Sequence, residues 1–115
     1  MWLQWPGGSV VLDAHLRKEI AQRIRTAAPD VEDVLLFGSH ARGDAQPDSD
    51  VDLVLLVAEG ADRKSVLLRA RRSLLGLGIG FDLVLLTRAQ WALTPTSGWL
   101  GAQMAREAVR VDVAA

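Results

Sequence analysis

Three acidic residues in apolar surroundings are the first candidates for chemistry in this chain. Asp50 and Asp52 bracket Val51 at the start of one aliphatic run, and Asp82 lies inside a later one. Because side chains on a strand alternate between its two faces, the carboxylates of Asp50 and Asp52 point the same way. Like charges held beside a hydrophobic core are costly unless a cation neutralises them. Such a set of oxygen ligands suits Mg²⁺ or Mn²⁺, with Asp82 supplied by a neighbouring strand.

The second chemical feature is the pair Gly38-Ser39, which follows a short apolar run and precedes what reads as one helical turn, His40 to Arg42. A helix N-terminus offers free backbone N–H groups to an anion. Glycine lets a phosphate approach the backbone closely, and a serine hydroxyl adds a donor. This phosphate cradle lies ten residues before Asp50. The combination is what a nucleoside triphosphate with its Mg²⁺ requires.

The elements that must position these residues alternate between helical and strand patterns. Leu16, Ile20 and Ile24 recur every four residues after Asp13, which predicts a helix that Pro29 ends. Asp62 is expected to cap a second helix. Strands are expected over 31–37, 51–57 and 79–86, a helical turn over 87–92, a last helix over about 98–107 and a short edge strand over 109–113. The fold class is therefore α/β or α+β, a small mixed sheet with helices packed on it.

Length and composition limit the classes of protein further. With 115 residues we expect one domain, in which 1–12 form an irregular lead-in and exposed Trp2 and Trp5 would mark a protein interface. Thirteen basic against fourteen acidic residues argue against a protein that coats nucleic acid. The absence of cysteine excludes disulfide scaffolds and thiol catalysis. No secretory signal or membrane-spanning stretch is recognisable, so the protein is expected to be soluble and cytoplasmic.

The spacing of these residues resembles a known signature. Gly38-Ser39, ten residues and then Asp50-Val51-Asp52 are similar to the Gly-Ser-x10-Asp-x-Asp signature of the DNA polymerase β-like nucleotidyltransferase superfamily. The string GSHARGDAQPDSDVDLVLLV resembles the minimal nucleotidyltransferases, the antitoxin partners of HEPN-domain toxins. The resemblance covers roughly residues 13 to 113. It implies the nucleotidyltransferase palm fold and a single minimal nucleotidyltransferase domain over 1–115.

The same resemblance implies roles for individual residues. It implies a two-metal transfer of a nucleoside monophosphate, with Mg²⁺ or alternatively Mn²⁺ as cofactor and ATP as donor. Asp50 and Asp52 would hold the metals, and Asp82 would complete the site and help deprotonate the acceptor hydroxyl. Four residues would contact phosphates: Gly38, Ser39, Arg42 and Ser49.

Plainer interpretations exist for each of these residues. Asp50 and Asp52 are also typical of a solvated strand end, and Asp82 of a strand edge. Gly38 is also typical of a turn, and Arg42 of a solvated surface. The glycines at 76, 78 and 80 do not indicate a dinucleotide site, because they follow a helix and precede a strand, the reverse of the required order.

The function implied is that of an enzyme that relies on a second protein. Only residues 83 to 115 follow Asp82, which leaves no room for a separate acceptor domain. The resemblance implies transfer of AMP to a tyrosine of a HEPN RNase toxin, which silences it, without direct contact to nucleic acid or membrane. Two alternatives remain: an antitoxin that neutralises by binding alone, and a nucleotidyltransferase for small molecules of the aminoglycoside type.

Overall fold

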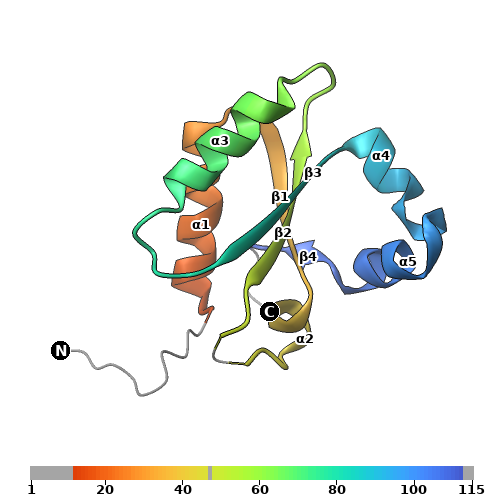
Figure 1. The fold of residues 1–115 in the computed structure, drawn as a ribbon, viewed down its shortest axis with the longest axis horizontal. Helices are drawn as coiled ribbons and strands as arrows, with labels where there is room; N and C mark the ends of the chain where they lie inside the picture. The colour runs from red at the N-terminus through yellow and green to blue at the C-terminus, as the bar shows by residue number, and fades with distance from the viewer. Residues whose placement is uncertain (1–11, 47, 113–115) are drawn as a thin grey trace.

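The computed structural model describes residues 12–46 and 48–112, so the predicted lead-in, Trp2 and Trp5 lie outside the described residues. The elements succeed one another along the chain as follows (Figure 1): α1 (Ala14–Ala27), β1 (Val31–Phe37), α2 (Ser39–Arg42), β2 (Val51–Val57), α3 (Arg63–Ser73), β3 (Phe81–Thr87), α4 (Arg88–Leu93), the 3₁₀ turn η2 (Thr94–Thr96), α5 (Gly98–Glu107) and β4 (Val109–Arg110). None of the helices in these ranges has the length and apolar character that a bilayer span requires.

Four strands form one mixed sheet in the order β3-β2-β1-β4. Strand β1 is antiparallel to both β2 and β4, whereas β2 and β3 run parallel. The carboxyl end of β1 therefore lies at the same edge of the sheet as the beginnings of β2 and β3. In this register Phe37 is opposite Asp52, and Asp52 is opposite Asp82.

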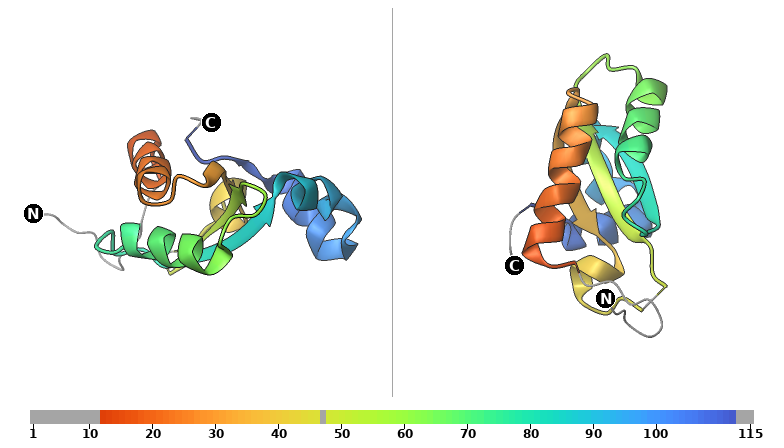
Figure 2. Two further views of the ribbon diagram at one scale, coloured as in Figure 1. Left: turned by 90° about the horizontal axis from the view of Figure 1, so that it is seen from above. Right: turned by 90° about the vertical axis from the view of Figure 1, so that its left-hand side faces the viewer.

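Helices cover both faces of the sheet. Helices α1 and α3 lie on one side, and α4 and α5 lie on the other (Figure 2). Leu53 and Leu55 of β2 point to the first side and pack with Ile20 and Ile24 of α1. Val54 and Leu56 point to the second side and join a smaller cluster with Leu35, Phe37, Val84, Leu86, Trp91, Met104 and Ala108. Strand β2 is thus central and almost wholly buried, as its aliphatic sequence predicts.

Local signals in the sequence determine where the helices begin. The carboxylate of Asp13 accepts a hydrogen bond from the backbone N–H of Leu16 at 2.8 Å, and that of Asp62 accepts one from Ser65 at 3.3 Å. Helix α4 begins with a capping box between Thr87 and Gln90. These contacts satisfy backbone donors that the first helical turn leaves free.

The observed bounds of most elements agree with the sequence patterns, and two strands are shorter than predicted. Strand β3 begins at Phe81 instead of residue 79, because Gly76 and Gly78 adopt positive φ angles of 90° and 70° and keep the chain turning. Within the described residues strand β4 comprises Val109 and Arg110, which pair with Leu36 and Leu35 at the edge of the sheet, and residue 113 of the predicted strand lies outside them.

Truncation of the central strand should destabilise the whole domain. Leu53 of β2 is fully buried against the helices α1 and α3. Leu53→Ala is therefore expected to lower the free energy of unfolding by about 2–5 kcal/mol. Urea denaturation followed by circular dichroism measures the change. Leu75→Ala is the control, because Leu75 is 72% exposed and its truncation should change stability by less than about 0.5 kcal/mol. Equal effects of the two substitutions would contradict the observed packing.

Candidate active site

The three predicted carboxylates lie together at one edge of the sheet. Asp52 on β2 is directly opposite Asp82 on β3, and Asp50 immediately precedes β2. Asp52 has the same phase as Val54, so it points toward the side that carries α4 and α5. The pKa of Asp52 is raised, first by burial and then by the negative charges of Asp82 and Asp50. The charged form of this group is therefore destabilised until a cation compensates it.

Two glycines allow these carboxylates to lie against the backbone. A Cβ atom at Gly38 would overlap the carboxylate of Asp52, whose Cγ lies 3.2 Å from that position, and the φ angle of Gly38 is +77°. A Cβ atom at Gly80 would likewise overlap the carboxylate of Asp50, whose Cγ lies 3.1 Å away. Gly80 also accepts a backbone hydrogen bond from Val51 at 2.8 Å. The sequence pattern around Gly80 gives no indication of this contact with Asp50.

A pocket of about 420 Å³ opens between this edge of the sheet, α2 and α5. Four predicted residues line it: Gly38, Ser39, Arg42 and Asp52. Its apolar wall comes from Phe37, Val84, Leu100 and Met104. Asp50 and Asp82 are not among the lining residues, but both lie next to Asp52. The pocket therefore places an apolar surface and the Gly-Ser pair on one side of the acidic cluster.

Arg42 is not simply solvated. Its guanidinium forms ion pairs with Asp44 at 3.2 Å and with Glu107, at the end of α5, at 3.0 Å. Gln103 donates a hydrogen bond to the same Glu107 carboxylate at 2.9 Å. Gln103 and Glu107 both line the pocket, and neither was a candidate from sequence. An acidic residue at the end of an amphipathic helix carries no signal that distinguishes it from a solvated one.

The loop between α2 and β2 is held by Ser49 and His40. The hydroxyl of Ser49 accepts a hydrogen bond from the backbone N–H of Gln46 at 2.8 Å. The carbonyl oxygen of Ser49 lies 3.3 Å from Nε2 of His40. In this arrangement the Ser49 hydroxyl bonds within the loop, and its contact with a phosphate stays a prediction. His40, to which the sequence interpretation gave no role, connects α2 to the residue just before Asp50.

The edge of the sheet that carries Asp50, Asp52 and Asp82, called here the acidic edge, suits a metal ion that is shared with a substrate. Among residues 12–46 and 48–112, no three acidic or histidine side chains are arranged to enclose an ion by themselves. Mg²⁺ is usually held by one or two carboxylates, with phosphate oxygens of the substrate and water completing its coordination. The all-oxygen donors and the raised pKa of Asp52 fit that mode of binding.

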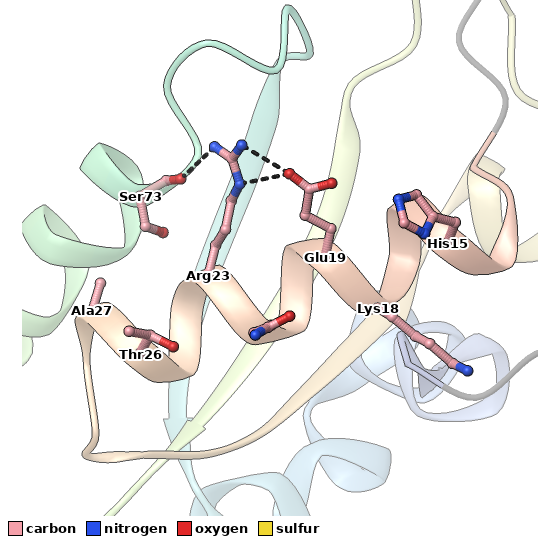
Figure 3. Close-up of a pocket in the computed structure, with 8 residues that line it drawn as sticks. His15, Lys18, Glu19, Arg23, Thr26, Ala27 and Ser73 are labelled. Atoms are coloured by element: carbon pink, nitrogen blue, oxygen red, sulfur yellow. Dashed lines mark hydrogen bonds and ion pairs between the residues drawn. The ribbon is translucent and has the colours of Figure 1, made fainter.

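A second and larger pocket, of about 780 Å³, runs along α1 and reaches Ser73 at the end of α3 (Figure 3). Arg23 crosses it, forming an ion pair with Glu19 at 2.8 Å and donating to the carbonyl oxygen of Ser73 at 3.1 Å. No predicted site residue lines this pocket. The smaller pocket, which lies beside the three carboxylates and is lined by four of the predicted residues, is therefore the candidate active site.

The fold and this acidic edge define a nucleotidyltransferase. A family model described as nucleotidyltransferase domain matches residues 17–97, which include both the Gly-Ser pair and all three carboxylates. The chain belongs to the nucleotidyltransferase domain family. No curated protein matches the chain.

Solved structures with the same fold include three that contain a toxin and its antitoxin. A toxin–antitoxin structure with AMP-PNP matches 83% of this chain and 71% of its own chain, at 24% identity and a TM-score of 0.62. A mutant of the toxin–antitoxin MntA-HpeT also matches 83% of this chain and 71% of its own chain, at 22% identity and a TM-score of 0.61. A third structure contains the tri-AMPylated HEPN toxin of Shewanella oneidensis in complex with MNT antitoxin. It matches 85% of this chain and 71% of its own chain, at 22% identity and a TM-score of 0.56. These likenesses confirm the predicted palm fold.

Removal of one charge from the acidic edge should stabilise the protein without nucleotide. Because the pKa of Asp52 is raised above its ordinary value of 3.8, the folded state binds the proton more tightly than the unfolded state. Stability is therefore lost as the pH rises from 3.8 through the raised pKa. Asp52→Asn should have a higher Tm than the parent protein at pH 7, and the difference should narrow as the pH falls towards 3.8.

Thermal unfolding between pH 4 and pH 8 measures this difference. Asp30→Asn is the control, because Asp30 is exposed in the turn before β1, away from the acidic edge. A Tm for Asp52→Asn that is lower than that of the parent protein at neutral pH would contradict the electrostatic account.

Proposed function

We propose that this chain is a cytoplasmic, Mg²⁺-dependent nucleotidyltransferase that transfers AMP from ATP to a tyrosine of a HEPN RNase toxin and so acts as its antitoxin. The observation that carries the proposal is the position of Asp52 and Asp82 on adjacent strands, with Asp50 immediately before β2 and the Gly38-Ser39 turn beside them. The fold shared with toxin–antitoxin structures, one with AMP-PNP and one with an AMPylated HEPN toxin, supports the choice of nucleotide and partner.

In the proposed reaction, the chain's residues bind and orient the nucleotide. Gly38 and Ser39 hold the β- and γ-phosphates through backbone N–H groups and the serine hydroxyl, with Arg42 and Ser49 as further phosphate contacts. Asp50 and Asp52 provide the carboxylates for two Mg²⁺ ions, with Mn²⁺ as an alternative, and Asp82 completes this set. Bound metal stabilises the charge that develops on the attacking and leaving oxygens.

The acceptor hydroxyl is provided by the partner. Asp82 is exposed at the edge of the sheet, where it can accept the proton of an approaching tyrosine hydroxyl. The tyrosine oxygen forms a bond to the α-phosphorus, the bond from that phosphorus to the α,β-bridging oxygen breaks, and pyrophosphate leaves. The tyrosine then carries AMP as a phosphodiester.

The first test follows the α-phosphate. The protein is incubated with Mg²⁺, ATP labelled at the α-phosphate and a lysate of its host, and the label is expected on a protein band that mass spectrometry identifies. Asp50→Asn/Asp52→Asn should reduce labelling on the order of 10²–10³-fold or more, the loss seen when a group that stabilises developing charge is removed.

The matched control is Asp30→Asn/Glu59→Gln, which makes the same change in charge at two exposed turn residues away from the site. It should label as well as the parent protein. Tight binding of a host protein without transfer of label would instead favour neutralisation by binding alone. Label on a small molecule such as an aminoglycoside would favour the other alternative.

A methyl group at Gly80 should reduce transfer without unfolding the protein. Gly80→Ala would push away the exposed carboxylate of Asp50, which is able to rotate toward solvent. Displacement of a catalytic group by about 1 Å costs on the order of 10²-fold in rate. The rate of labelling and the Tm are measured together, and an unchanged rate would show that the position of Asp50 is not critical.

A further inference from the structure

The carboxylate of Glu107 occupies the part of the pocket that faces the Gly-Ser turn. Nη1 of Arg42 lies 3.0 Å from one of its oxygens and 3.1 Å from the other. Nε2 of Gln103 lies 2.9 Å from the second oxygen. The Glu107 side chain is only 16% exposed, so this carboxylate is held in place by its donors.

The charge of Glu107 is stabilised in this position. Its pKa is lowered, first by the hydrogen bond from Gln103, then by Arg42, with a further contribution from the backbone N–H of Gly38. The carboxylate is therefore ionised at neutral pH. Arg42, its ion-pair partner, and Gly38, which lines the same pocket, both belong to the group proposed above to bind phosphate. Arginine and backbone N–H groups bind carboxylate and phosphate oxygens in the same way.

We propose that Glu107 competes with the nucleotide: its carboxylate takes the place of a phosphate in the free protein, and a phosphate of the nucleotide displaces it. The inference rests on the proposed function, since it assigns the phosphate site to Gly38 and Arg42. Both Glu107 oxygens lie on Nη1 of Arg42, so a phosphate that binds this nitrogen must displace the Glu107 carboxylate. Glu107 thereby sets the affinity of the site for nucleotide.

Glu107 could instead assist nucleotide binding by orienting Arg42, and this role predicts the opposite change in affinity. If the ion pair only orients Arg42 toward the nucleotide, loss of the charge would weaken binding. Glu107→Gln distinguishes the two roles, because glutamine keeps the size of the side chain and an oxygen acceptor but removes the negative charge.

Calorimetric titration with AMP-PNP and Mg²⁺ tests the proposal. We expect Glu107→Gln to lower the Kd about two- to fivefold, the range that corresponds to a partly exposed ion pair. The matched control is Glu32→Gln, which removes the exposed ion pair between Glu32 and Arg88 at 3.0 Å, at residues that do not line the pocket. Its Kd should equal that of the parent protein.

Each other outcome overturns a specific statement. An unchanged or higher Kd for Glu107→Gln, with normal binding by the parent protein, overturns the competition while the proposed function stands. No binding by parent and variant alike overturns both.

A second measurement does not depend on the variant's affinity. The carboxyl carbon resonance of Glu107, identified by its loss in Glu107→Gln, should titrate below the ordinary pKa of 4.5 in the free protein. It should titrate at or above 4.5 once AMP-PNP is bound. A pKa that stays low with nucleotide bound would show that the carboxylate keeps its donors and would also overturn the proposal.

Discussion

Strand β2 pairs with β1 on one side and with β3 on the other, and this pairing positions the three carboxylates and the Gly38-Ser39 turn of the candidate site. The antiparallel register with β1 places the end of that strand, and hence the Gly38-Ser39 turn, beside Asp52. The parallel register with β3 places Asp82 beside the same residue. A shift of either register by one residue would turn the side chains to the opposite face. The full burial of Leu53 and Leu55 fixes the phase of β2, so the hydrophobic core determines where the carboxylates point.

The carboxylates of the acidic edge lower the stability of the free protein, although the proposed reaction requires them. Asp50, Asp52 and Asp82 lie at the beginnings of the otherwise apolar strands β2 and β3, and burial together with mutual repulsion raises the pKa of Asp52. An apolar or amide side chain would suit the free protein better. Gly38 and Gly80 leave space for the carboxylates of Asp52 and Asp50, and they add to this cost because glycine loses more conformational freedom on folding than other residues. Such local conflicts with stability are typical of functional sites.

Much of this arrangement is predictable from the sequence. The bounds of β1, β2 and α5 follow from short apolar runs and a helical pattern, and the side-chain alternation of β2 predicts that Asp50 and Asp52 share a face. The contact between Asp50 and Gly80 and the position of Glu107 were not predictable. Both depend on how segments far apart in the chain pack, and Glu107 lies 65 residues from Arg42 in sequence. A glycine before a strand or an acid at a helix end gives no local signal of such a contact.

Strand β4 fixes the backbone that directly follows Glu107. Val109 and Arg110 pair with β1 directly after Glu107, and Arg17 of α1 donates to the carbonyl oxygens of Val111 at 2.9 Å and Arg110 at 3.3 Å. The backbone beside Glu107 is thereby tied both to the sheet and to α1. Exchange of anions at Arg42 then needs rotation of the Arg42 and Glu107 side chains, and the backbone that is tied to β1 and α1 can stay in place.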